Sequence, residues 1–529
     1  MQQLYYNGTI LTMERPLYAQ AVLVEEGRIL SVGNLEELTG QAKPGTERID
    51  LEGHTLLPAF IDSHSHFSAV ATGLLQLSLE DCASFQEVEN AIRAFITGRK
   101  LAKGAWILAR GYDHNHLKEG RHPSLPLLDR AAPYNPLVLQ HQSGHMGVFN
   151  SAALEELGVH PDTPVPSGGR IGQENGALTG YMEENAFLEY LKRVPLPSVE
   201  ALLDAYQEAQ QLYASYGITT VQEGMLTQQL VELYQALLHS GRLQLDVVGY
   251  LDAACRQPLL DAFGEHLGRY HKHFKVGGYK IFLDGSPQSR TAWMRLPYVG
   301  EESYRGYNTL TDGQVEAYVR QAVQDGMQLL AHCNGDAACE QYLTAVKKVA
   351  GELGRSETAA IRPVMIHAQL LGIDQLELVR ELSVIPSFFI AHIYHWGDIH
   401  LRNFGPERAE KISPANAALH RGIPFTFHQD APVIAPDMLE TVWCAVERTT
   451  KDGVTLGQEE RIDVLDALRA VTVHSAYQYF EEGEKGSIVP GKRADFVILD
   501  RNPLEVERKM LRDIQVLETI REGKSIYHR

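Results

Sequence analysis

The chain has 529 residues, of which 44% are hydrophobic and 22% are charged, so its length and composition suit a globular protein with a large core and more than one domain. Its formal net charge of -19 argues against a nucleic-acid partner, because phosphate binding needs a basic surface. Its five cysteines show no spacing typical of a zinc knuckle or redox motif, which argues against a disulfide framework and fits a reducing compartment.

Residues 1–57 are predicted to form short strands separated by turns. Asn7-Gly8, Glu26-Gly27 and Glu52-Gly53 supply the turns, a pattern typical of a small antiparallel sheet. The first eight residues lack a basic segment followed by an apolar one, so we expect no signal peptide. No apolar run approaches the roughly 20 residues that a membrane span needs. We therefore expect a soluble, cytoplasmic protein with no membrane partner.

An apolar run over residues 57–61 leads into His64 and His66. A β-strand would project both imidazoles from one face, where two can share a metal ion. With 22 histidines, chance alone supplies about one His-x-His triplet, and the chain has two others, His114/His116 and His271/His273. Only the first closes a run that resembles a buried strand. The other two lie in polar surroundings, and a surface position is favoured for the His114/His116 pair.

From residue 58 onward, short apolar strands alternate with helix-like stretches, the pattern of a parallel sheet or barrel. We predict eight strands, the number that closes a (β/α)8 barrel, at 58–61, 217–222, 245–251, 277–283, 328–331, 364–366, 384–389 and 423–427. The interval between the first two strands, about 150 residues, is far longer than an ordinary connection. It must contain an inserted lobe, within about residues 67–216.

Strand-like segments return at the other end of the chain, at residues 494–500, 516–521 and 524–527. Neither end has enough strands for a stable sheet of its own. The simplest prediction is one composite β domain made from residues 1–57 and 485–529, with the barrel occupying residues 58–484.

Potential metal ligands stand where the predicted strands end, which is where barrel enzymes carry their reactive groups. They are His64 and His66 after the first strand, Lys280 in the fourth, His332 after the fifth, His367 after the sixth and Asp430 after the eighth. A single histidine there is more often a core residue, and an Asp before a proline also suits a loop cap. A lysine in an apolar strand is harder to explain, because burying an ammonium costs several kcal/mol unless it is paired, deprotonated or modified.

These residues resemble the amidohydrolase superfamily of metal-dependent hydrolases, and more closely the branch that contains N-substituted formamide deformylase and exoenzyme-regulatory-protein-like hydrolases. The resemblance covers the whole chain and rests on residues 57–66, 280–286, 331–336, 366–367, 396–398 and 490–496. It implies an α/β fold, a distorted (β/α)8 TIM barrel with a small β-sandwich built from both termini. It also implies a centre of one or two ions of zinc or a similar divalent metal.

The same resemblance implies a role for each ligand. His64, His66 and Asp430 would bind the more buried ion, and His332 and His367 the second. Lys280, carboxylated by carbon dioxide, would bridge the two ions, which offset the cost of burying the anionic carbamate. A metal-activated water would attack the substrate carbonyl, and Asp430 would pass its proton to the leaving amine. The expected reaction is hydrolysis of a C–N bond in a small amide-like molecule, such as an N-formyl, N-acyl or cyclic amide.

Two further histidines are candidates for substrate contact, His145 in the segment 144–151 and His392 in the segment 391–398, with a structural role equally open. Residues 168–183 are expected to form a hairpin in or near the inserted lobe. Gln222-Glu223 stands where many superfamily members have a strand-ending Asp, so the role of Glu223 is open.

Two other functions are compatible with the sequence. A deaminase of the same superfamily would use a single metal and lack the bridging lysine. A regulatory or binding protein would have kept the fold and lost catalysis, which is disfavoured because all six expected ligands are present. A homodimer is the base-rate expectation for assembly.

Overall fold

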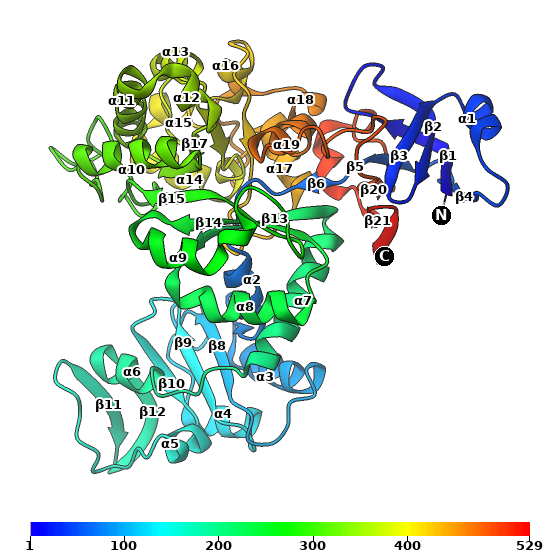
Figure 1. The fold of residues 1–529 in the computed structure, drawn as a ribbon. Coiled ribbons are helices and arrows are strands. Elements are labelled where there is room, and N and C mark those ends of the chain that lie inside the picture. Colours follow the sequence, from blue (N-terminus) through cyan, green and yellow to red (C-terminus); the bar gives the residue numbers. More distant parts are fainter. Residues whose placement is uncertain (1) are drawn as a thin grey trace. The chain divides into compact units, whose positions relative to one another are not determined.

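The computed structural model describes residues 2–529, which divide into two compact units. The first combines the chain up to Val70 with Gln207–Arg529, and the second is Ala71–Tyr206 (Figure 1). Across residues 2–529, none of the helices combines the length and apolar composition that crossing a bilayer requires.

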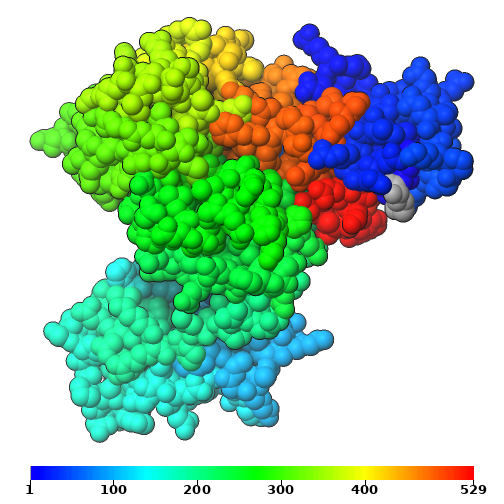
Figure 2. Space-filling view, in the orientation of Figure 1, coloured from blue at the N-terminus to red at the C-terminus, as the bar shows by residue number. Residues whose placement is uncertain are grey.

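Both ends of the chain contribute strands to one eight-stranded sheet in the first unit, in the order β22-β21-β20-β5-β1-β2-β3 with β4 beside β1. Its strands are β1 (Gln2–Leu11), β2 (Tyr18–Glu25), β3 (Arg28–Gly33), β4 (Glu47–Asp50), β5 (Thr55–Pro58), β20 (Phe496–Leu499), β21 (Val516–Arg521) and β22 (Lys524–His528). Strand β5 joins the two ends, because it pairs with β1 on one side and β20 on the other. The blue and red segments therefore lie side by side in Figures 1 and 2.

The terminal sheet is mixed, so the prediction of an antiparallel sheet was wrong. Strand β1 is antiparallel to β2 but parallel to β4 and β5. The reason is helix α1 (Leu35–Gln41), which separates β3 from β4 and begins at Asn34, whose side chain accepts a hydrogen bond from the Glu36 amide. Its buried Leu38 packs against Leu4 and Leu23. This crossover returns the chain in the direction of β1, which a tight hairpin turn cannot do.

Eight parallel strands form the second sheet of the first unit, in the order β6-β13-β14-β15-β16-β17-β18-β19, and each predicted strand overlaps one of them. They are β6 (Phe60–Ile61), β13 (Ile218–Leu226), β14 (Asp246–Asp252), β15 (Phe274–Phe282), β16 (Gln328–Cys333), β17 (Val364–His367), β18 (Ile385–Phe388) and β19 (Thr426–Phe427). Just beyond the end of β6, Ser63 Oγ donates to the Phe427 carbonyl at 2.8 Å. The Asp430 amide donates to the His64 carbonyl at 3.2 Å. The sheet is therefore TIM-barrel-like.

The interior of this sheet is filled by apolar side chains from strands on all sides of it. Val248, Leu330, Ile366 and Ile385 belong to one buried cluster although they come from four different strands. This packing of side chains from separate strands fits the interior of a curved sheet. Helices occur in the connections after the strands: α8 (Val231–Ser240), α9 (Arg256–Phe263), α10 (Asp312–Asp325), α11 (Asp336–Leu353), α12 (Arg355–Ala360), α13 (Leu376–Glu381), α14 (His392–Phe404), α15 (Pro406–Ala409), α16 (Ala415–Leu419), α17 (Met438–Glu447), α18 (Val464–Ala470) and α19 (Val473–Gln478).

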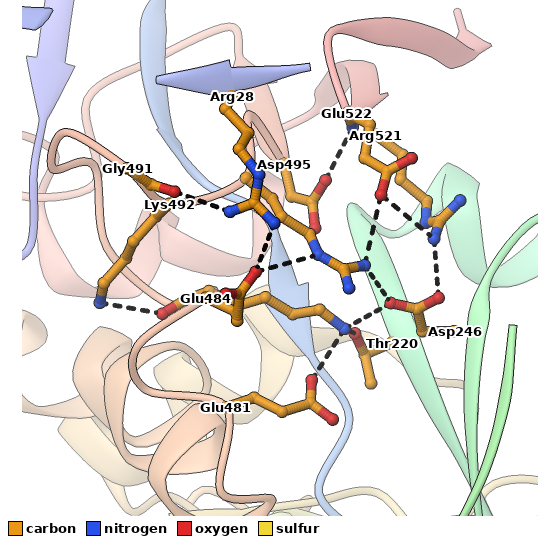
Figure 3. A network of polar contacts seen from close by, with 12 residues as sticks. Arg28, Thr220, Asp246, Glu481, Glu484, Gly491, Lys492, Asp495, Arg521 and Glu522 are labelled. Carbon is orange, nitrogen blue, oxygen red and sulfur yellow. Dashed lines mark hydrogen bonds and ion pairs between the residues drawn. The ribbon is translucent and has the colours of Figure 1, made fainter. Parts of the chain in front are cut away.

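A buried ion network ties the barrel to the C-terminal segment (Figure 3). Asp246, the first residue of β14, lies 2.6 Å from Lys485 Nζ, 2.9 Å from Arg493 Nη1 and 2.7 Å from Arg521 Nη2. Lys485 also lies 2.8 Å from Glu481. Burial alone would raise the pKa of Asp246, but Lys485 and the two arginines lower that pKa well below its usual range. The carboxylate thus stays ionised and holds β21 against the beginning of β14.

The second unit is built on a six-stranded sheet in the order β11-β12-β10-β9-β8-β7. Its strands are β7 (Leu77–Ser78), β8 (Ile107–Tyr112), β9 (Leu137–His141), β10 (Met146–Phe149), β11 (Gly169–Glu174) and β12 (Ala177–Glu183). Strands β11 and β12 form the expected hairpin. Its helices are α3 (Phe85–Gly98), α4 (Leu125–Ala131), α5 (Ser151–Glu156) and α6 (Glu184–Leu191), and the division between the units falls within α2 (Phe67–Leu74) and α7 (Val199–Ser215).

Helices cover both faces of this second sheet. Along β9, Leu137 and Leu139 belong to the cluster that contains residues of α3 and α4. Val138, between them, belongs to the cluster that contains residues of α5 and α6. Successive side chains of a strand point to opposite faces, so this alternation gives the unit a core on each side of the sheet.

Candidate metal centre

The six predicted ligands come from the carboxyl-terminal halves or ends of five barrel strands. His64 and His66 follow β6, Lys280 lies in β15, His332 in β16, His367 ends β17, and Asp430 follows β19. Parallel strands end at one edge of the sheet, so side chains that are far apart in sequence can converge there.

Asp430 is the residue around which the imidazoles gather. Its Oδ1 lies 3.5 Å from Nε2 of His64 and 3.4 Å from Nε2 of His66. Its Oδ2 lies 4.0 Å from Nε2 of His367. Oδ1 is buried and accepts no hydrogen bond among residues 2–529. His64, His367 and Asp430 thus offer one ligand atom each, all within 4.8 Å of one another.

Gln222 determines which nitrogen of His64 carries the proton. Gln222 Nε2 donates to the Ser63 carbonyl and to Tyr479 Oη, each at 2.8 Å. The atom that faces His64 Nδ1, at 2.5 Å, is therefore the amide oxygen Oε1. Because this oxygen can only accept, Nδ1 carries the proton and Nε2 presents a lone pair to Asp430.

A chain of four hydrogen bonds determines the tautomer of His367 in the same way. The Phe427 carbonyl can only accept, so Ser63 Oγ donates to it at 2.8 Å and itself accepts from Ser387 Oγ at 3.4 Å. Ser387 Oγ then accepts from Nδ1 of His428 at 2.9 Å. Nε2 of His428 is left as the acceptor for His367 Nδ1, at 3.1 Å. Nε2 of His367 therefore also presents a lone pair to the cluster.

Nε2 of His64 and Nε2 of His367 thus point toward the Asp430 carboxylate. Neither nitrogen carries a proton, so neither can donate a hydrogen bond to it. Burial lowers the pKa of His64 and the pKa of His367 well below the usual range, so protonation does not relieve the repulsion. Such an arrangement is unfavourable unless a cation lies between the groups. The separations at Asp430 Oδ1 are close to the edge of a tetrahedral site, about 3.3 Å for metal–ligand distances of about 2.0–2.1 Å. The donor set therefore fits a zinc-type ion.

Lys280 is fully buried beside this cluster. Its Nζ lies 3.3 Å from Nε2 of His64. Burial lowers the pKa of Lys280 to about 7, although Asp430 acts in the opposite direction. A large fraction of the side chain is therefore the neutral amine near pH 7, which is the form able to react with carbon dioxide.

His332 lies next to His367, with 4.5 Å between the ring centroids. Its Nδ1 lies 3.3 Å from Oδ1 of Asp284. Asp284 is held in place by the backbone N–H groups of Asn334, at 2.9 Å, and Gly335, at 2.7 Å. Nδ1 of His332 makes no hydrogen bond among residues 2–529, and Nε2 lies 3.3 Å from Asn334 Nδ2, so the carboxylate stands behind the ring without a hydrogen bond to it.

The two predicted substrate contacts lie in different surroundings. His392 is buried at the start of α14, where its Nδ1 lies 3.1 Å from Nε2 of His400 and its ring contacts Phe389. His145 belongs to the second unit and is exposed, with its Nδ1 3.3 Å from Glu184 Oε2. Contact with substrate stays a prediction for both histidines.

Glu223, whose role the sequence left open, is a buried structural carboxylate. Its Oε2 accepts hydrogen bonds from the Ser68 amide at 2.9 Å, from the Ser68 hydroxyl, and from Tyr234 Oη at 2.8 Å. These donors satisfy the buried charge and hold the first turn of α2 against β13.

Sequence reasoning missed Gln222 and His428, which orient the ligands from behind. A signal was present for His428, because it directly follows the predicted strand 423–427, at the end where barrel enzymes carry their reactive groups. No comparable signal marked Gln222, since its contact with His64 depends on the pairing of β13 with β6.

The chain resembles known proteins along nearly its whole length. The sequence pattern of the amidohydrolase family matches residues 47–527. An N-substituted formamide deformylase of Arthrobacter pascens is 29% identical over 544 residues, which cover 99% of this chain and 98% of that protein. The putative amidohydrolase YtcJ of Bacillus subtilis is 27% identical, with 100% of both chains covered. The crystal structure of an uncharacterized metal-dependent hydrolase from Pyrococcus horikoshii superposes with a TM-score of 0.76 at 25% identity, covering 96% of this chain and 99% of that one.

Proposed function

The chain belongs to the amidohydrolase family, and we propose that it uses the Asp430 centre to hydrolyse a carbon–nitrogen bond in a small amide-like substrate. The observation that carries this proposal is the convergence of three imidazoles on Asp430. Nε2 of His64 and Nε2 of His66 lie 3.5 and 3.4 Å from Oδ1, a buried oxygen without a hydrogen bond, and Nε2 of His367 lies 4.0 Å from Oδ2. Imidazole nitrogens around a carboxylate are a ligand set typical of zinc.

In this proposal the Asp430 centre holds two ions. His64, His66 and Asp430 would hold the first, His332 and His367 the second, with carboxylated Lys280 bridging them. A zinc-type ion in such a site acts as a Lewis acid that activates water near neutral pH and polarises a carbonyl group.

The protein's own contribution is proton transfer and orientation. Oδ1 of Asp430 faces the imidazoles of His64 and His66, so Oδ2 is the oxygen that can hold a proton. Asp430 would take that proton from the attacking water at Oδ2 and deliver it to the leaving nitrogen. Gln222 and His428 keep the ligating nitrogens deprotonated, which preserves the charge balance of the site during this transfer.

The relative from Arthrobacter pascens supports the choice of bond, because its name assigns it the deformylation of N-substituted formamides. N-formyl compounds are therefore the first substrates to test, followed by N-acyl and cyclic amides. At 29% identity the substrate pocket can differ while the reaction is retained.

The test is a hydrolysis screen with metal-reconstituted protein against these three classes of amide, with metal content measured on the same samples. We expect release of amine by the wild type and a rate lower by about 10²-fold or more for Asp430→Asn, since general acid–base groups contribute about 10²–10⁴. Equal rates for wild type and Asp430→Asn would exclude the proposed proton transfer. Absence of turnover in all three classes, with metal bound, would exclude amide hydrolysis as the function.

The bridging role of Lys280 is tested separately, because a single-metal deaminase is the main alternative. We expect the Asp430 centre of wild type to hold two ions and that of Lys280→Ala one, with activity partly restored to the variant by a short carboxylic acid. Carbon-13 NMR of protein equilibrated with labelled bicarbonate should show a carbamate signal that Lys280→Ala lacks. One ion at this centre and no carbamate in the wild type would favour the deaminase.

A further inference from the structure

The His114/His116 motif acquires partners in the second unit that the sequence did not indicate. A surface position holds for His116, whose side chain is 84% exposed, but not for His114, which is 28% exposed. His114 Nδ1 lies 3.1 Å from Nε2 of His141, a residue that is 6% exposed. We propose that Asp113, His114 and His141 bind a divalent, zinc-type metal ion, in a site separate from the Asp430 centre.

The first argument is the size of the triangle formed by the three ligand atoms. Oδ1 of Asp113 lies 3.4 Å from Nε2 of His141 and 3.7 Å from Nδ1 of His114. The third side of the triangle, between Nδ1 of His114 and Nε2 of His141, is 3.1 Å. These three distances are on average close to the ligand–ligand distance of about 3.3 Å expected for tetrahedral zinc. One carboxylate and two imidazoles also form a ligand set that zinc commonly takes, with one coordination position left open.

The second argument is the position of the triangle on the sheet. Strands β8 and β9 are parallel neighbours, and Tyr112, the last residue of β8, pairs with His141, the last residue of β9. Asp113 and His114 follow Tyr112 directly. The carboxyl ends of two adjacent parallel strands therefore place the three side chains together, without requiring a loop to change shape.

The third argument is the set of groups behind the ligands. Oγ of Ser143 lies 3.0 Å from Nδ1 of His141, and the Ser143 amide donates to the same nitrogen at 3.1 Å, so the ring is held in place. A metal ion at Nε2 would require the other tautomer, in which Nδ1 donates to Ser143 Oγ. The Asn115 amide donates to Oδ1 of Asp113 at 2.9 Å, and Gln142 Nε2 donates to its Oδ2. Hydrogen bonds of this kind orient the ligands of known metal sites.

An aromatic ring supports the remaining ligand. The ring of His122 stacks on the ring of His114, with 4.2 Å between the centroids, and Nδ1 of His122 lies 3.0 Å from Tyr112 Oη. This packing restricts the rotamer of His114, so its Nδ1 is held toward His141 before any ion binds.

A cavity gives an ion access to the triangle. Its volume is about 510 Å³, and its lining includes Asp113 and His141 together with Arg110, Gln140 and Gln142. The open coordination position of the proposed ion can therefore take a water or a small ligand from this cavity.

The experiment is a metal count on the full-length chain. Protein freed of metal with a chelator is dialysed against excess zinc, and bound zinc is measured by mass spectrometry for wild type, His141→Ala, Asp113→Asn and the matched control His160→Ala, an exposed histidine of the same unit. We expect one ion fewer per chain in the first two variants and the wild-type number in His160→Ala. The same number of ions in wild type and His141→Ala would overturn the proposal.

Two further measurements test the proposal if a variant folds poorly. Thermal unfolding in chelator should give the same midpoint for Asp113→Asn and wild type if only metal binding is affected. Anomalous diffraction at the zinc edge from wild-type crystals needs no variant at all. We expect a peak between Asp113 and His141, and its absence when the Asp430 centre is occupied would overturn the proposal. Because the variants keep all ligands of the Asp430 centre, this outcome is independent of the proposed hydrolase activity.

Discussion

Nε2 of His428 lies 3.1 Å from Nδ1 of His367, so a ligand from β17 is oriented by a residue that follows β19. His428 contacts Ser387 on its other side, at 2.9 Å, and burial lowers the pKa of His428 to about 3. It therefore stays neutral at physiological pH and accepts the proton of His367 without competing for it.

Replacing His428 with Phe should weaken metal binding, because His367 would lose the acceptor that keeps its Nε2 deprotonated. Groups in this position typically contribute about 10- to 100-fold in metal affinity. A titration against a competing chelator measures this loss. The matched variant Ser387→Ala removes the acceptor of the His428 Nδ1 proton but keeps His428 itself, so it should have a smaller effect. An unchanged affinity in His428→Phe would show that the contact is a packing contact.

Gly224 makes room for the ring of His64. A Cβ at this position would lie 2.7 Å from the Ser65 carbonyl and 2.8 Å from Cε1 of His64. Gly224→Ala should therefore displace the imidazole and reduce metal affinity and activity together. Gly351 in α11 has nothing within 4 Å of the equivalent Cβ, so Gly351→Ala serves as the control and should leave both unchanged. Wild-type metal affinity in Gly224→Ala would contradict this prediction.

The stability of the metal-free protein should fall as the pH falls below 6.5. Burial lowers the pKa of His400 from 6.5 to about 3. Between these values the unfolded chain binds a proton at His400 and the folded chain does not, so acid favours unfolding by at most about 1.4 kcal/mol per pH unit. His400→Leu should reduce the slope of unfolding free energy against pH, measured in chelator, whereas the exposed His239→Leu should not. Identical slopes for wild type and His400→Leu would refute the assignment.

Lys485→Met should destabilise the first unit, because it removes one cation from the buried network of Asp246 and Glu481. Breaking a buried pair from one side typically costs about 3–5 kcal/mol, and the two arginines that remain at Asp246 place our expectation near the lower value. Urea denaturation measures the change. Lys509→Met, which removes an exposed pair with Glu507, should leave the urea midpoint nearly unchanged, because solvent screens an exposed pair. Equal losses in the two variants would contradict a buried network.

The parts of the fold that could be predicted from sequence are those with a local signal. The eight parallel strands are short apolar runs between turns, and each predicted strand overlaps an observed one. The direction of β4 and β5 could not be predicted, because it depends on α1, a helix with only one fully buried residue, Leu38. Such a short helix carries too little periodicity to detect.

The same distinction applies to the candidate site. The six expected ligands follow strands or lie in the carboxyl-terminal halves of strands, a position visible in the sequence. Gln222, His428 and His141 make their contacts only after strands have paired, at separations of 158, 61 and 27 residues from their partners. No pattern within one segment reports such a contact.

The shared terminal sheet also has a consequence for synthesis of the chain. Arg28 donates to the Gly491 carbonyl, 463 positions later in the sequence. Strand β5 can pair with β20 only when this last part of the chain has been synthesised. At about 5–20 residues per second, the edge of β5 waits on the order of half a minute to a minute and a half on the ribosome. An unpaired edge is a template for association with other chains. The nascent protein therefore depends on protection of its first strands until the final segment emerges.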